Sequence, residues 1–432
     1  MPLRPHSRLR PILEVAQRAA ALVLLIACSC GSPAPASNKA ESWTMYRGDL
    51  ARDGHPPAAT LDVQAVSRLG PSWLAHLDGA VDGTPAVIAG LVIAGSAGGT
   101  LAAFDARTGA TMWARHGLGA IADSPAVAGD RVFVGTLTGR VYASHISGGD
   151  AIWDWSAPPN AAVWASPVAY RDLVIVGVSS PYGDIPLVPG RLFGLDAATG
   201  RVRWTVCVRI DCAPGDGVWS TPAIDGHGVA FVGVGNPDDG VLAFDPSTGA
   251  RKWLASLYPD RDLDLDVGAA PVTFELEGRE VVAQAAVEGL FAVLDAATGA
   301  FVWSREIVKG SAVHGLIASP AYDGSALYAG SASPPTGMYA LSPADGSVRW
   351  RRDTGQPVYS APAVAKGLVL FGTGAVFGDL GVGSLLAVSA SDGHVLWSRD
   401  VHSAVRSGPA IAGDLVVVGD NAGEVMAFRP RS

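Results

Sequence analysis

The sequence predicts an all-β fold: a closed ring built from eight copies of one unit of four short strands. Three observations support this prediction. Charged residues make up only 16% of the 432 residues, Gly (53) and Pro (30) are abundant, and one short motif recurs along the chain. Low charge together with 49% hydrophobic residues argues against disorder, which needs the opposite composition. Abundant turn formers indicate many short strands rather than a few long helices.

Each copy of the motif opens with a small residue, then Pro, then Ala or Val. The eight prolines are Pro85, Pro125, Pro167, Pro222, Pro271, Pro320, Pro362 and Pro409. Alternating apolar residues follow, and then Asp-x-x-x-Gly-x-x-x-Trp or a close variant, as from Asp105 to Trp113. Repeats of about 40 to 50 residues, each with four short strands, are typical of β-propeller blades.

Each recurring residue has a structural reason to stand where it does. Pro opens the innermost strand, where its missing N–H costs least. The acid accepts backbone hydrogen bonds in a turn, and the Gly takes the positive φ that this turn requires. The Trp begins the next strand as a large apolar anchor. These roles predict a strand, a turn and a strand in every unit.

The eighth unit stops at residues 428–430, before any Trp strand. The missing strand is predicted at the other end of the chain, in residues 71–77, which include Trp73. We therefore expect this N-terminal strand to pair into the last blade and to close one domain spanning residues 43–430. Closure removes exposed strand edges that would otherwise aggregate.

The N-terminus has the features of an export signal. Arginines precede an apolar run from Ala19 to Ala27, which is far shorter than the ~20 residues of a membrane-spanning helix. The run ends in Leu25-Ile26-Ala27-Cys28, which resembles a bacterial lipobox. This predicts a lipoprotein signal peptide over residues 1–27, lipidation of Cys28, and a flexible Pro-rich tether over residues 28–42. The alternative is an ordinary cleaved signal with an incidental cysteine.

The same N-terminal resemblance predicts location and partners. Ser29 follows the cysteine, which implies the periplasmic face of the outer membrane in a Gram-negative cell and the cell surface otherwise. The partners expected are the membrane, through the lipid anchor, and proteins of the cell envelope. Nucleic acid is not expected, because the net charge is −9 and the basic residues are scattered.

Cys207 and Cys212 lie close together in a chain that is expected to be exported. Exported proteins retain disulfides, so one loop-stapling disulfide is predicted. Metal binding would need further Cys or His ligands nearby, and the surrounding sequence has none.

The unit from Ala103 to Trp113 and its copies resemble the pyrroloquinoline-quinone (PQQ) repeat family. This family includes quinoprotein alcohol dehydrogenases, polyvinyl-alcohol-dehydrogenase-like proteins and BamB-like lipoproteins. Trp43 with the following residues 46–49 is similar to the segment that precedes the first blade in the family. The resemblance implies an eight-bladed β-propeller, and it leaves the function open because members are enzymes or scaffolds.

The resemblance also implies a cofactor site. Trp219 is similar to the Trp that stacks under the quinone, Trp164 occupies the same place one blade earlier, and Ser166 is similar to a hydroxyl that contacts the cofactor. A flat conjugated cofactor favours an indole face. Packing between blades is the alternative role for both tryptophans.

The implied calcium site combines amide and carboxylate oxygens, which Ca²⁺ prefers. Asn236 is similar to a calcium-ligating Asn. Asp264 or Asp266 would be the calcium-bound catalytic base that takes the alcohol proton. The alternative for the acidic run from Asp260 to Asp266 is a solvated loop.

Three departures from the dehydrogenases are visible. No Glu stands in residues 180–183, where those enzymes place a calcium ligand, and Glu288 stands near the place of their quinone-facing Lys or Arg. No Cys-x-x-Cys-His is present, so no covalent haem is expected. Arg191 and Arg209 are the candidates for a replacement cation.

These departures favour a lipid-anchored binding or scaffold propeller that is related to quinoproteins but has no complete redox site. The alternative is a PQQ- and Ca²⁺-dependent alcohol dehydrogenase of the polyvinyl-alcohol type.

Overall fold

A computed structural model of the chain describes residues 41–431, apart from residues 216, 261–263 and 376–380. The chain divides into two units, Met1–Ala36 and Ser37–Ser432, and the described residues belong to the second. The predicted signal peptide, Cys28, most of the tether and Asp262 lie outside the described residues. Within the described ranges, no helix has the length and apolar character needed to cross a lipid bilayer.

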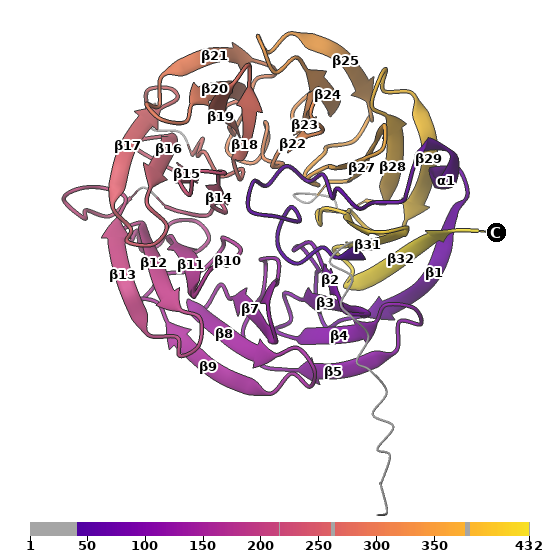
Figure 1. Cartoon of the computed structure of the whole chain (residues 1–432), viewed down its shortest axis with the longest axis horizontal. Coiled ribbons are helices and arrows are strands. Elements are labelled where there is room, and N and C mark those ends of the chain that lie inside the picture. Colours follow the sequence, from indigo (N-terminus) through magenta and orange to yellow (C-terminus); the bar gives the residue numbers. More distant parts are fainter. Residues whose placement is uncertain (1–40, 216, 261–263, 376–380, 432) are drawn as a thin grey trace, which may run out of the picture. The chain divides into compact units, whose positions relative to one another are not determined.

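The predicted ring of eight four-stranded blades is confirmed (Figure 1). Blades 1 and 2 contain β2 (Ala86–Ile88), β3 (Leu91–Gly95), β4 (Leu101–Asp105), β5 (Thr111–Arg115), β6 (Ala126–Ala128), β7 (Arg131–Gly135), β8 (Arg140–His145) and β9 (Ala151–Ser156). Blades 3 and 4 contain β10 (Val168–Tyr170), β11 (Leu173–Val178), β12 (Arg191–Asp196), β13 (Val202–Cys207), β14 (Ala223–Ile224), β15 (Ala230–Val234), β16 (Gly240–Phe244) and β17 (Arg251–Ser256).

The other four blades repeat this antiparallel pattern. Blades 5 and 6 contain β18 (Val272–Leu276), β19 (Arg279–Ala285), β20 (Leu290–Asp295), β21 (Phe301–Glu306), β22 (Ala321–Tyr322), β23 (Leu327–Ser331), β24 (Gly337–Leu341) and β25 (Val348–Asp353). Blades 7 and 8 contain β26 (Ala363–Ala365), β27 (Leu368–Gly372), β28 (Gly383–Ser389), β29 (Val395–Val401), β30 (Ala410–Ala412), β31 (Leu415–Gly419), β32 (Glu424–Pro430) and β1 (Leu69–His76). The innermost strand of each blade begins directly after the motif Pro.

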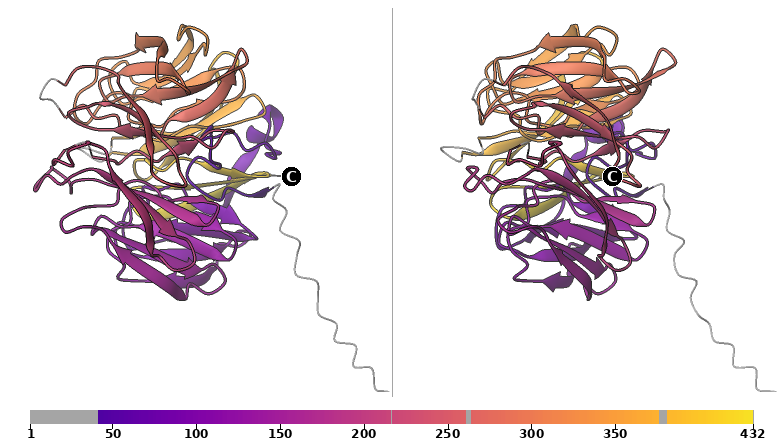
Figure 2. Two further views of the ribbon diagram at one scale, coloured as in Figure 1. Left: turned by 60° about the vertical axis from the view of Figure 1, so that its left-hand side comes forward. Right: turned by 90° about the vertical axis from the view of Figure 1, so that its left-hand side faces the viewer.

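The two ends of the ring meet in blade 8, as predicted (Figure 1 and Figure 2). β1 pairs antiparallel with β32, with Trp73 opposite Ala427 and a bulge beside Pro71. A short helix, α1 (Val63–Val66), precedes β1, and the Asp62 side chain caps it by accepting hydrogen bonds from backbone N–H groups. The N-terminal strand therefore supplies the outer strand that the eighth unit lacks.

In seven of the eight blades, the motif Trp packs against a Gly of the next blade rather than only within its own blade. Its ring covers the motif Gly in the following turn, and a Cβ added to that Gly would lie 2.5 to 2.8 Å from a ring atom. We call these seven contacts the girdle: Trp73–Gly109, Trp113–Gly149, Trp153–Gly200, Trp204–Gly249, Trp253–Gly299, Trp303–Gly346 and Trp350–Gly393. The seven glycines have φ between +68° and +75°. Each of these positions thus needs Gly for two reasons: the turn requires a positive φ, and the Trp side chain leaves no room for a Cβ.

The segment from residue 43 to 60, here called the lead-in, runs along the inner edge of the ring before α1. Its carbonyls accept hydrogen bonds of 2.7 to 3.0 Å from six inner strands, each from the second residue after the motif Pro. The donors are Val87, Val127, Ile224, Thr273, Tyr322 and Val364. The lead-in therefore covers inner strand edges that would otherwise present unpaired N–H groups.

Two buried arginines fasten the lead-in. The Arg47 side chain donates to the Pro320 carbonyl, and the Arg52 side chain donates to the Pro222 carbonyl, each at 2.9 Å. Burial lowers the pKa of Arg52 to about 10, so the group stays charged at neutral pH. Both contacts place a guanidinium against the start of an inner strand.

Candidate functional site

In every blade, the residue three positions before the motif Pro lines the same shared cavity. This cavity, of about 120 Å³, is several times the roughly 10–15 Å³ that one water requires. We call these eight residues the inner ring: Asp82, Ala122, Trp164, Trp219, Gly268, Ile317, Tyr359 and Arg406. The inner ring is therefore the position in the repeat at which all eight blades face the same cavity.

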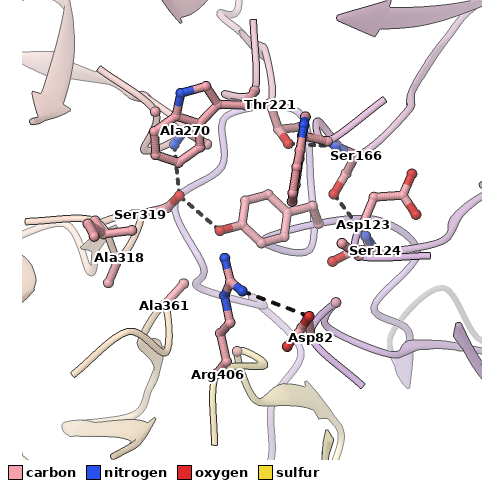
Figure 3. Close-up of a pocket in the computed structure, with 18 of the residues that line it drawn as sticks. Asp82, Asp123, Ser124, Ser166, Thr221, Ala270, Ala318, Ser319, Ala361 and Arg406 are labelled. Carbon is pink, nitrogen blue, oxygen red and sulfur yellow. Dashed lines mark hydrogen bonds and ion pairs between the residues drawn. The ribbon is translucent and has the colours of Figure 1, made fainter. Parts of the chain in front are cut away.

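Hydroxyl groups directly before the motif Pro link neighbouring blades around this cavity (Figure 3). The Ser124 N–H donates to the Ser166 hydroxyl at 2.9 Å, and the Ser166 N–H donates to the Thr221 hydroxyl at 3.0 Å. The Ala270 N–H donates in the same way to Ser319 at 2.8 Å. A hydroxyl that accepts one such bond keeps its own O–H to donate. Ser166, the predicted cofactor contact, therefore has both a structural bond and a place in the cavity wall.

The lead-in contributes Tyr46 to the cavity. The Tyr46 hydroxyl donates to the Ser319 hydroxyl at 2.9 Å. The family resemblance identified the lead-in, but nothing in its spacing showed that Tyr46 reaches a residue 273 positions away.

Trp219 lies against the next blade. A Cβ added to Gly268 would lie 1.9 Å from a ring carbon of Trp219, so the indole covers this Gly closely. The Trp219 Nε1–H donates to the Asp266 carboxylate at 2.6 Å. Trp219 is only half-buried, because its ring also lines the cavity.

Asp266 is held by two donors. The Asn236 backbone N–H donates to its Oδ1 at 3.1 Å, while Trp219 donates to Oδ2. Burial raises the pKa of Asp266 to about 6, the two hydrogen bonds oppose this rise, and the charges of Asp264 and Asp184 add to it. This carboxyl therefore changes its charge closer to neutral pH than an ordinary Asp.

Trp164 faces the cavity from the blade before Trp219. Its Nε1–H donates to the Ser180 carbonyl at 3.1 Å, and its ring centre lies 6.4 Å from that of Tyr182. Tyr182 is exposed, so aromatic surface continues from the cavity to solvent.

The predicted site residues fall into two groups. Trp164, Ser166 and Trp219 line the cavity, whereas Asn236 and Asp266 adjoin it through Trp219. Asp264 is exposed, and desolvation with the negative charge of Asp184 raises its pKa. Sequence reasoning missed Asp184, which directly follows the segment 180–183 in which the resemblance placed a Glu.

The carboxyl groups near the cavity are spread out rather than clustered. Across residues 41–431 as described, no three Asp, Glu, His or Cys side chains gather closely enough to hold a metal ion. Both Asp266 oxygens already accept hydrogen bonds from N–H groups.

The cation of the cavity comes from an unexpected blade. Arg191 and Arg209, the predicted candidates, are absent from the cavity wall, and the Arg209 Nε donates to Asp211 at 3.2 Å. Arg406 is the one Lys or Arg among the described lining residues, and its NH1 lies 3.8 Å from an Asp82 oxygen. Counting three residues back from each motif Pro would have found both Arg406 and Asp82.

Asp123 also lines the cavity and is 2% exposed. The Gly135 N–H donates to one of its oxygens at 2.5 Å, and the other oxygen has no hydrogen-bond partner among the described residues. Burial raises the pKa of Asp123 well above the usual carboxyl value. This group is therefore protonated over a wider pH range than an exposed Asp.

Cys207 and Cys212 form a disulfide next to blade 3. The segment that follows Cys212 pairs with the loop carrying Tyr182, through a bridge between Pro189 and Gly215. The disulfide thus supports the rim beside Trp164 rather than the cavity itself.

Comparisons with known proteins agree with this architecture. The family model described as outer membrane protein assembly factor BamB matches residues 43–236, 188–313 and 287–432. A polyvinylalcohol dehydrogenase from Sphingopyxis sp. (strain 113P3) is 25% identical over 387 residues, covering 73% of this chain and 59% of that protein. The chain therefore spans less than two thirds of the length of this relative.

Two solved structures show the same fold at low identity. The quinohemoprotein alcohol dehydrogenase from Comamonas testosteroni has a TM-score of 0.77 and 17% identity, covering 90% of this chain and 80% of that one. BamB from Moraxella catarrhalis has a TM-score of 0.62 and 18% identity, covering 84% of this chain and 97% of that one. The fold is therefore shared by an enzyme and an assembly factor.

Proposed function

We propose, on the premise that this chain belongs to the PQQ-repeat β-propeller family, that it is an exported propeller binding a planar quinone of the PQQ type in its channel cavity. One observation carries the proposal: two neighbouring inner-ring residues, Trp164 and Trp219, present indole rings to a cavity whose wall also contains several hydroxyl groups. Flat conjugated ligands stack favourably on such rings, and hydroxyls supply directional hydrogen bonds.

Trp219 would support the ring plane of the ligand, because Gly268 and Asp266 hold the indole in place from behind. Ser166, Thr221 and Ser319 would donate to oxygens at the edge of the ligand. A bound quinone supplies a two-electron acceptor. The protein's own contribution is to orient this ring and to shield one of its faces from water.

The test is retention of PQQ by purified protein lacking residues 1–28. We expect quinone absorbance to co-elute with the protein in gel filtration and Trp219→Ala to abolish it. Trp155→Ala is the matched control, because Trp155 is half-buried on β9 and lies outside the cavity wall. Retention by the Trp219 variant at the wild-type level would show that the quinone, if bound, lies elsewhere.

A second candidate is alcohol oxidation of the polyvinyl-alcohol type. Two observations favour it: the relative described above, and Asp266 beside Trp219 with its pKa raised to about 6. An ionised Asp266 could accept the alcohol proton. In this case alcohol-dependent dye reduction should rise as the pH passes about 6 and disappear in Asp266→Asn. Running the assay with Ca²⁺ and with a chelator tests whether a metal contributes.

Anchoring and partners complete the proposal. Lipidation of Cys28 would hold the propeller at a membrane, facing the periplasm in a Gram-negative cell, where envelope proteins could bind it. Labelling cells with a fatty acid such as palmitate tests this: the full chain should carry label and Cys28→Ser should carry none. A labelled Cys28→Ser protein would place the anchor elsewhere.

A further inference from the structure

The inner ring has a charged side, formed by Asp82 and Arg406, to which no role has been assigned above. Arg406 in blade 8 and Asp82 in blade 1 are neighbours in the ring, and both line the cavity (Figure 3). Trp164 and Trp219 belong to blades 3 and 4, which lie two to four blades away around the ring of eight. The cavity therefore has an aromatic side and a charged side.

Asp82 does not saturate Arg406. The 3.8 Å between their nearest nitrogen and oxygen exceeds the roughly 2.7–2.9 Å of a charge-assisted hydrogen bond. A guanidinium carries five N–H donors, and its planar fork matches a carboxylate held by two parallel bonds. Arg406 is about a third exposed in its side chain, so a ligand entering the cavity can reach it.

The other groups near Arg406 do not compete for it. The Tyr359 hydroxyl donates to the Val313 carbonyl at 2.9 Å. Asp123, the other acid in the wall, is buried and accepts from the Gly135 N–H. Among the described residues that line this side of the cavity, Asp82 is therefore the one carboxylate paired with Arg406. A carboxylate of the ligand would meet a guanidinium whose charge is only partly neutralised.

We propose that Arg406 anchors a carboxylate of the ligand, so that the cavity selects planar aromatic carboxylates over neutral aromatics of the same shape. Asp82 competes with the ligand for the guanidinium and keeps it oriented when the cavity is empty. This inference rests on the proposed quinone-binding function and adds the charge that the ligand must carry. PQQ, a flat tricarboxylate, satisfies that requirement, and its methyl esters do not.

The experiment compares PQQ with its trimethyl ester, using quenching of tryptophan fluorescence to measure affinity. Wild type should bind the acid at least about tenfold more tightly than Arg406→Gln does, since truncating one partner of a desolvated charge pair is costly. The ester should bind both proteins equally within about twofold. Asp82→Asn should bind the acid about threefold more tightly than wild type, because it removes the competitor.

Two controls separate charge from structure. Arg107→Gln removes the same charge from an exposed turn and should leave both affinities unchanged. Thermal unfolding of Arg406→Gln should match wild type, because the side chain makes one loose ion pair.

Each remaining outcome has a definite meaning. Unchanged binding of the acid by Arg406→Gln would overturn the inference while leaving the quinone proposal intact. Equal weakening of acid and ester would also overturn it, because Arg406 would then shape the cavity rather than bind a carboxylate. If wild type bound neither compound, the proposed function itself would fail, and this inference with it.

Discussion

The girdle and the inner ring come from the same repeat, and they differ in how much they vary. At the girdle, seven blades use the same Trp over the same left-handed Gly. At the inner ring, the eight blades carry seven residue types of very different chemistry, from Gly to Trp and from Asp to Arg. The girdle solves one packing problem that recurs at every blade junction, whereas the inner ring faces a shared space that no neighbouring blade fills. Variation within a repeat therefore marks the surface that is free to take on a function.

The first test of this difference between the girdle and the inner ring is to truncate one Trp in each. Trp113→Ala removes a buried girdle ring and its hydrogen bond to the Ile146 carbonyl, and should cost about 3–5 kcal/mol of unfolding free energy. Trp219→Ala removes a half-buried ring and should cost roughly 1 kcal/mol. Denaturant unfolding measures both. Similar losses would mean that Trp219 is a packing residue.

The second test addresses the girdle glycines. Gly249→Ala places a methyl group 2.5 Å from the Trp204 ring at φ +74°, so strain and overpacking together should cost about 2–4 kcal/mol. Gly278→Ala is the matched control, because Gly278 has φ +78° with nothing within 4 Å of the added Cβ. It should cost only about 1–2 kcal/mol. Equal losses in thermal or denaturant melts would show that backbone strain alone explains the girdle glycines.

A third, smaller effect concerns Asp123 behind the inner ring. Because burial raises its pKa, the folded chain binds this proton more tightly than the unfolded chain. Its contribution to stability is therefore complete below the unfolded pKa of about 3.9 and is lost as pH rises through the folded pKa. Asp123→Asn should remove this loss in unfolding free energies measured from pH 4 to 8.

Exposed Asp105 is the control of opposite sign. Hydrogen bonds from the Thr108 side chain and backbone lower the pKa of Asp105. Its contribution is present above the unfolded pKa and is lost as pH falls, so Asp105→Asn should leave the slope between pH 4 and 8 unchanged. A slope that survived in Asp123→Asn would assign the pH dependence to another group.

Much of the fold was predictable because its signals are local and repeated. The Pro, Gly and Trp spacing defined the blades, and the missing last strand together with Trp73 predicted how the ring closes. The contact of each Trp with the next blade was not predictable, because spacing along one unit does not show which neighbour a ring meets. The same limit hid the contacts of the lead-in, whose carbonyls meet strands spread over almost the whole ring.

The candidate site was only partly predictable. The resemblance pointed to Trp164, Ser166 and Trp219, and they share one cavity wall. Arg191 and Arg209 were the candidates to replace the cation that the resemblance did not find, and the wall instead contains Arg406 from blade 8. The difference has a physical cause: Arg191 and Arg209 lie near the tryptophans along the chain, whereas a closed ring brings residues together by their position in each repeat.

The amino-acid sequence alone specifies the all-β class, the number of blades and the closing strand, because strand periodicity and turn residues are local features of the chain. Three features come from the tertiary structure: the eight inner-ring residues share one cavity, Tyr46 of the lead-in enters it, and Arg406 lies beside Asp82. These contacts join residues tens to hundreds of positions apart. Closure of the ring, rather than any local preference, brings them within reach of one another.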